Sequence, residues 1–151
     1  MSVLLEYENQ IYIDMYHNDA LLIEAGGLGV ERIFTNFIKL YSDPTQLVII
    51  INTHESEEQY FTNRLKDNDM LPTKITTETH SQSQRAEAYL KGGCFFITSR
   101  ILVVDMLKDR IPIDLITGLL VFNAHKIIDS CQETFILRMF RQKNKVKQIF
   151  T

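Results

Sequence analysis

The chain has 151 residues, of which 45% are hydrophobic and 23% are charged, and its formal net charge is −3. A chain of this size can bury one hydrophobic core, so we expect a single domain over residues 1–151. No apolar stretch approaches the roughly 20 residues that cross a bilayer. The first residues also lack the basic start and apolar block of a signal peptide. We therefore expect no membrane partner.

The apolar pattern alternates between the helical and the strand period along the chain. Helices are predicted over residues 1–16, 30–41, 55–65, 82–90 and 126–141. Strands are predicted over residues 20–24, 47–51, 74–76, 94–97, 119–122 and 148–151. Residues 100–107 fit a strand by their β-branched run, or a helix capped by Thr98 or Ser99. This alternation predicts an α/β fold whose parallel sheet is covered on both faces.

Several side chains have expected places in this fold. Four phenylalanines recur at helical spacing and are predicted to lie in the core: Phe34, Phe37, Phe135 and Phe140. Arg85 and Tyr89 lie one helical turn apart and are interpreted as a local packing pair. Cys94 and Cys131 are expected to be reduced thiols, because no secretory signal precedes them. Neither they nor the scattered histidines have the spacing of a zinc site, so no metal ligands are predicted.

Residues 25–32 read Ala-Gly-Gly-Leu-Gly-Val-Glu-Arg, between a predicted strand and a predicted helix. That order is typical of a phosphate-binding loop, here built on Gly27 and Gly29. A working loop ends in a lysine that reaches the phosphates and a hydroxyl that holds Mg²⁺. Val30 occupies the lysine position and Glu31 the hydroxyl position. The alternative is an ordinary glycine turn before a helix.

A second degenerate motif follows the strand predicted at 119–122. A helicase strand of this kind carries Asp-Glu-Ala-His, in which the Asp holds Mg²⁺ through water and the Glu polarises the attacking water. Here Phe122 and Asn123 replace the two acids, and His125 remains as a packing or hydrogen-bonding residue. A phenyl ring binds no metal, and a carboxamide is no general base. Together the two motifs predict a nucleotide-site frame that binds neither ATP nor Mg²⁺.

The glycine motif is accompanied by longer stretches that are more specific. The stretches are residues 27–29 of that motif, 98–105, 110–112, 114–118, 124–125, 130–133, 135–138 and 140–145. On these stretches, from Leu4 to about Lys145, the chain resembles the N-terminal helicase-like region of the XPF family of structure-specific DNA-repair endonucleases. The resemblance implies a RecA-like three-layer α/β/α lobe, a degenerate superfamily 2 helicase lobe, within a longer protein.

The resemblance also implies a function for the whole protein. Family members cut the damaged strand at duplex-to-single-strand junctions in nucleotide excision repair and interstrand crosslink repair. Their nuclease centre and its Mg²⁺ belong to a C-terminal domain, and we find no such carboxylate cluster here, where acids are expected on helix surfaces. The implied partners are branched or splayed DNA, repair scaffold proteins and a smaller non-catalytic subunit bound through absent C-terminal domains. The implied location is the nucleus.

In related helicases, loops that follow strands hold the phosphates of single-stranded DNA with backbone amides and short hydroxyl side chains. The matching positions are Asn52, Thr53, Thr98, Ser99 and Arg100. Arg100 is expected to pair with a phosphate. The alternatives are helix caps for the hydroxyls and a surface salt bridge for the arginine. Acidic side chains at the start of the 55–65 helix would repel DNA.

The charge is unevenly distributed along the chain. Residues 1–70 hold 4 Lys or Arg against 12 Asp or Glu, whereas residues 71–151 hold 12 against 7, so the halves carry −8 and +5. The basic part peaks at Arg138, Arg141, Lys143 and Lys145, which we interpret as a contact with DNA or a second lobe, or as a solvated helix end. The acidic half favours an alternative function, a protein-docking module that does not bind DNA.

Overall fold

The computed structural model describes residues 4–16, 30–66, 71–123, 131–143 and 148–150. Its strands are β1 (Leu47–Ile51), β2 (Thr73–Ile75), β3 (Gly93–Ile97), β4 (Gly118–Val121) and β5 (Gln148–Phe150). Its helices are α1 (Glu6–Tyr16), α2 (Val30–Tyr41), α3 (Glu55–Arg64), α4 (Gln82–Lys91), α5 (Ser99–Leu107) and α6 (Gln132–Lys143). One turn of 3-10 helix, η1, spans Ile113–Leu115.

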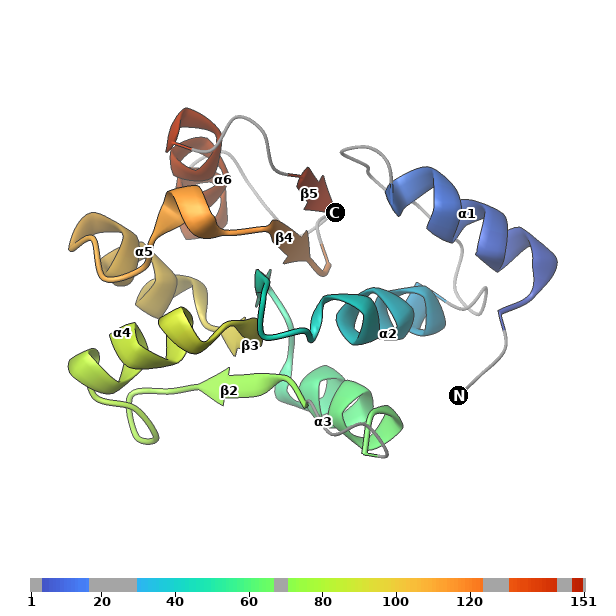
Figure 1. The fold of residues 1–151 in the computed structure, drawn as a ribbon, viewed down its shortest axis with the longest axis horizontal. Helices are drawn as coiled ribbons and strands as arrows, with labels where there is room; N and C mark the ends of the chain where they lie inside the picture. The colour runs from blue at the N-terminus through green and yellow to red at the C-terminus, as the bar shows by residue number, and fades with distance from the viewer. Residues whose placement is uncertain (1–3, 17–29, 67–70, 124–130, 144–147, 151) are drawn as a thin grey trace.

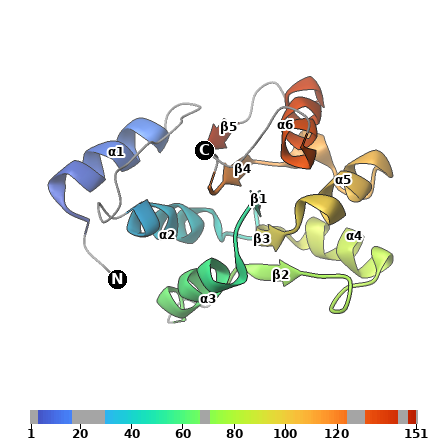
Figure 2. The same ribbon diagram turned by 180° about the vertical axis from the view of Figure 1, so that it is seen from behind.

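The strands form one sheet in the order β2-β3-β1-β4-β5, and every neighbouring pair is parallel. Figure 1 shows α1, α2 and α3 on one side of the sheet and α4, α5 and α6 on the other. The view from behind in Figure 2 shows the same three layers. The predicted α/β fold with a parallel sheet covered on both faces is therefore confirmed.

The central strand β1 explains why both faces need helices. All five of its residues are buried, as expected for a parallel strand that has no solvent face. Val48 and Ile50 pack in one cluster with residues of α2 and α3, whereas Ile49 and Ile51 pack in the other with residues of α5 and α6. This alternation follows from the two-residue period of a strand.

The predicted elements within the described residues are mostly confirmed. The structure also decides residues 100–107, which lie in α5: Thr98 accepts a hydrogen bond from the backbone N–H of Ile101 at 3.3 Å, and the helix buries Leu102 and Met106. Cys131, predicted to lie in the last helix, precedes α6, and α6 begins at Gln132; residues 126–130 of that predicted helix lie outside the described residues. The strand predicted at 20–24 lies outside the described residues.

Two predictions of burial are wrong. Phe135 is 38% exposed. Ile136 and Phe140 lie on the face of α6 that packs on the core, and Phe135, the residue before Ile136, lies off that face. Acids are not confined to helix surfaces, since Glu8 and Asp105 are fully buried. Glu8 forms an ion pair of 2.6 Å with Arg32 of α2 and accepts a hydrogen bond from the Leu5 backbone, which compensates its burial.

Both thiols are free, as predicted, and burial raises the pKa of Cys94 to about 12. Within the described residues, no helix combines the length and apolarity that crossing a membrane requires. The same part of the chain contains no group of three or more side chains suited to hold a metal ion.

Candidate nucleotide and nucleic-acid site

The end of β4 carries the side chain predicted to replace a metal-binding acid. Phe122 donates its backbone N–H to the Ile51 carbonyl at 3.1 Å, so its chain position is fixed by the sheet. Its ring is 8% exposed and lies edge-on to Phe34, at 4.8 Å and 76°, and to Phe61, at 5.6 Å and 87°. Such edge-to-face pairs are favourable. The position is therefore part of the aromatic core.

The next residue, Asn123, forms a reciprocal pair with Asn52 at the end of β1. Asn52 donates its side-chain amide to the carbonyls of Phe122 and Asn123, both at 2.9 Å, and Asn123 donates to the Asn52 carbonyl at 3.3 Å. Both residues have positive φ, 64° for Asn52 and 52° for Asn123. Asparagine tolerates this left-handed conformation better than most residues. The two loops are thus locked to each other.

Asn123 also reaches the first turn of α3. Its amide donates to both carboxylate oxygens of Glu57, at 2.8 Å and 3.2 Å. Glu57 accepts a further hydrogen bond of 2.9 Å from the His54 backbone N–H, which begins α3 as a capping box. The side chain at the position of the general base therefore donates hydrogen bonds, whereas a base must accept a proton.

The residues predicted at the end of the glycine loop lie at the start of α2. Val30 is half-buried and Glu31 is exposed. Glu31 and Phe122 line one cavity of about 260 Å³, together with residues from α3: Ser56, Glu57, Tyr60 and Phe61. The structure thus brings one residue from each degenerate motif to the same place. The other predicted members, Gly27, Gly29 and His125, lie outside the described residues.

The predicted DNA-contacting hydroxyls are engaged within the chain. Thr53 donates to a Glu58 oxygen at 3.0 Å, and Thr98 is the N-cap of α5. Ser99 is buried and donates to Glu133 of α6 at 2.8 Å. Burial alone would raise the pKa of Glu133, but hydrogen bonds from Ser99, its own backbone and Cys131 outweigh it and lower the pKa.

Arg100 differs from these neighbours. Its side chain is exposed, and it forms no ion pair with any residue that the structure describes. In the predicted basic cluster, Arg138 is exposed, Arg141 lies over the Phe140 ring at 5.7 Å, and Lys143 forms an exposed ion pair with Asp109 at 3.4 Å. Lys145 lies outside the described residues.

Comparison with known proteins gives the same family from several organisms. The chain is 53% identical over 96% of its length to a DNA repair endonuclease XPF of Cricetulus griseus, and 47% identical over 95% to that of Drosophila melanogaster. It is 31% identical over 83% of its length to the DNA repair protein RAD1 of Saccharomyces cerevisiae. The chain matches the N-terminal region of the XPF-type DNA repair endonucleases. No family model matches it.

The chain spans only 16% of the Cricetulus XPF and 14% of the other two relatives. A solved structure of the Pyrococcus furiosus Hef helicase domain matches 95% of the chain, and the chain covers 31% of that structure, with a TM-score of 0.78 at 17% identity. The fold of the chain is therefore like that of this helicase domain, a RecA-like α/β fold.

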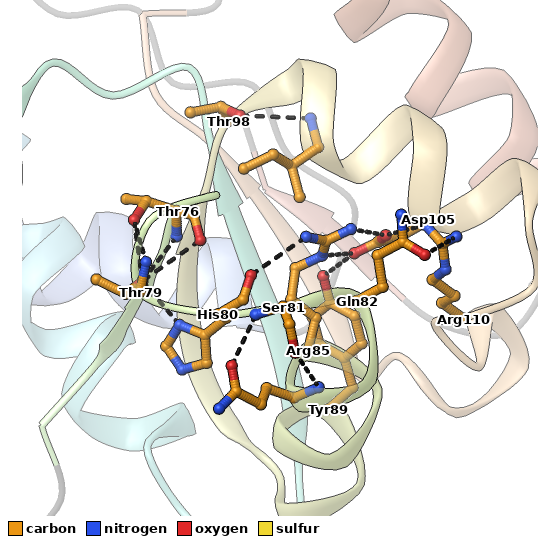
Figure 3. A network of polar contacts seen from close by, with 12 residues as sticks. Thr76, Thr79, His80, Ser81, Gln82, Arg85, Tyr89, Thr98, Asp105 and Arg110 are labelled. Carbon is orange, nitrogen blue, oxygen red and sulfur yellow. Dashed lines mark hydrogen bonds and ion pairs between the residues drawn. The ribbon is translucent and has the colours of Figure 1, made fainter.

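The structure also contains a polar network where the sequence predicted a packing pair of Arg85 and Tyr89 (Figure 3). Asp105 of α5 accepts hydrogen bonds from Nε and Nη2 of Arg85, each at 2.9 Å, and from the Tyr89 hydroxyl at 2.5 Å. Arg110 approaches the same carboxylate at 3.4 Å. Burial, followed by the bond to Asp105, raises the pKa of Tyr89. The network fastens α4 to α5, and the spacing of Arg85 and Tyr89 was its only signal in the sequence.

Proposed function

We propose that this region is a helicase-like module that no longer hydrolyses ATP and belongs to a nuclear XPF-type endonuclease. In the whole protein it would help to engage branched or splayed DNA and dock repair scaffold proteins during nucleotide excision and interstrand crosslink repair. The nuclease centre, its Mg²⁺ and the contacts with a smaller non-catalytic subunit would belong to other parts of that protein.

The arrangement at the end of β4 carries the ATPase-dead part of the proposal. Phe122 is packed between aromatic rings, and the side-chain amide of Asn123 donates hydrogen bonds to Asn52 and Glu57. A triphosphate needs a cationic side chain to offset its charge. Glu31 and Glu57 line this cavity instead, so anionic phosphates would meet carboxylates.

The nucleotide half of the proposal is tested by titrating the chain with Mg-ATP. We expect no saturable heat of binding, no thermal shift and no DNA-stimulated phosphate release. The variant Val30→Lys with Glu31→Thr should also fail to turn over ATP, because Phe122 and Asn123 are unchanged. A saturable Mg-ATP complex of the natural chain would overturn the proposal.

The DNA half depends on Arg100, an exposed cation in the first turn of α5, just after β3, which forms no ion pair with the described residues. We expect the chain to bind splayed-arm DNA with an affinity that falls as salt rises, because phosphate contacts release counterions. Arg100→Ala should weaken binding severalfold and reduce the slope of log affinity against log salt by about one. Fluorescence anisotropy at several salt concentrations measures both effects, and Lys74→Ala, which removes a cation already paired with Glu55 and Glu58, is the control.

A second function, protein docking without DNA binding, is favoured by one observation. The polar side chains of Asn52, Thr53 and Ser99 are all hydrogen-bonded within the chain, which leaves few donors for phosphates. If anisotropy detects no salt-dependent binding and Arg100→Ala changes nothing, this alternative replaces the DNA-binding function.

A further inference from the structure

The cavity between the first turns of α2 and α3 has its own chemistry. Its volume of about 260 Å³ is just below the range of about 300–1,000 Å³ typical of pockets for drug-sized ligands. A space of this size suits one long side chain better than a nucleotide. Its lining combines two carboxylates, Glu31 and Glu57, with three aromatic rings, Tyr60, Phe61 and Phe122.

Among the residues that the structure describes, neither carboxylate of the cavity has a basic partner. Glu57 accepts hydrogen bonds there from two uncharged donors, the Asn123 amide and the His54 backbone. Glu31 is exposed, and its carboxylate forms no ion pair within the described part of the chain. The nearby cation of β2, Lys74, is paired with Glu55 and Glu58 instead. The cavity is therefore acidic without an internal counterion among its lining residues.

The aromatic rings, like the carboxylates, attract a positively charged group. A guanidinium or ammonium group is held over an aromatic face by the negative potential of the ring. The chain already makes such a contact beside the cavity, because the Arg64 guanidinium lies 5.2 Å from the centre of the Tyr60 ring. Tyr60 is only half-buried. Rings and carboxylates therefore favour a planar cation and disfavour an anion.

We propose that this cavity is a docking site for a positively charged side chain, preferentially arginine, on a segment of a partner protein. The guanidinium packs against the half-buried Tyr60 ring and donates hydrogen bonds to Glu31 and Glu57, a combination that arginine makes better than lysine. This inference rests on the proposed loss of ATP binding, because a triphosphate in the cavity would exclude the arginine. The position that serves phosphates in an active helicase would then recognise the opposite charge.

The test uses a small probe, N-acetyl-arginine N-methylamide, titrated into the ¹⁵N-labelled chain and followed by NMR. We expect saturable shifts of the backbone amides of Glu31, Ser56 and Tyr60. The matched probe with citrulline, which has nearly the same shape but no charge, should shift these amides at least fivefold less at the same concentration. Equal responses to the two probes would overturn the inference.

Glu31→Gln removes one charge without removing a side-chain hydrogen bond to any described residue, so it separates recognition from stability. We expect it to weaken binding of the arginine probe at least threefold. Glu78→Gln, at an exposed glutamate outside the cavity, should leave binding unchanged. An unaltered affinity in Glu31→Gln would also overturn the inference.

A parallel titration with Mg-ATP distinguishes the two proposals. Saturable shifts of the same amides with Mg-ATP would overturn the proposed loss of nucleotide binding. If neither Mg-ATP nor the arginine probe shifts these amides, the proposed loss of nucleotide binding stands and only the arginine site is overturned.

Discussion

Two places on the carboxyl edge of one sheet use similar residues in opposite ways. At the ends of β1 and β4, the amides of Asn52 and Asn123 are bonded to each other's loops and to Glu57. At the end of β3, the hydroxyls of Thr98 and Ser99 are also used by the chain, but Arg100 extends into solvent.

The difference teaches that residue type alone does not make a binding residue. A polar side chain at a strand end is available to a ligand only if its own fold does not satisfy it first. The ends of β1 and β4 form a structural joint, and after β3 Arg100 forms no ion pair with any described residue. Four substitutions test this contrast, and we order them from the largest expected loss of stability to the smallest.

Asp105→Ala should cost most, roughly 3–5 kcal/mol of unfolding free energy, because it leaves Arg85 buried without its counterion. Loss of these bonds would detach α5 from α4, so Arg100, which lies on α5, would no longer be held in place after β3. Urea unfolding followed by circular dichroism measures it. Asp114→Ala, at an exposed aspartate, should stay within about 0.5 kcal/mol. A cost below about 1 kcal/mol for Asp105→Ala would contradict a stabilising role for the network.

Phe122→Ala should cost roughly 3 kcal/mol, the lower end for a phenylalanine truncation, because the ring is almost fully buried against Phe34 and Phe61. The same urea titration gives the value. Phe135→Ala removes an equal side chain at a site that is 38% exposed, and it should cost clearly less. Similar costs at the two sites would mean that the end of β4 is not part of the core.

Asn123→Ala should cost roughly 1–3 kcal/mol, because it removes hydrogen bonds to Asn52 and Glu57 at a position with φ of 52°. Asn123→Gly relieves the backbone strain but not the lost hydrogen bonds, so its cost should fall between those of Ala and the natural chain. Thermal unfolding of the three proteins separates the two contributions. Identical melting of Ala and Gly would rule out a backbone contribution.

Thr98→Ala should cost about 1 kcal/mol, the usual value of a helix N-cap. Thr98→Ser keeps the hydroxyl that accepts the Ile101 N–H and should be nearly neutral. Chemical unfolding of both variants provides the comparison. If Ser were as costly as Ala, the hydroxyl would not be the group that begins α5.

The elements whose burial is uniform could be predicted from the sequence. The run at residues 47–51 is apolar throughout, so only a strand covered on both faces accommodates it, and β1 is that strand. Residues 100–107 could not be decided in this way, because their β-branched run and the Thr98 cap favour different structures. The tertiary contacts of Leu102 and Met106 select the helix.

The sequence by itself determined the alternation of strands and helices, the resemblance to XPF-type endonucleases, and which residues are predicted to replace the two acids of the helicase motif. Each of these depends on residue identity and on local periodicity, which a single chain contains. Only the tertiary structure decided that Asn52 and Asn123, which are 71 residues apart, pair with each other, that Asp105 is a buried ion partner, and that Glu31 and Glu57 line one cavity. Those contacts join residues distant in sequence, and no local pattern records which distant groups will meet.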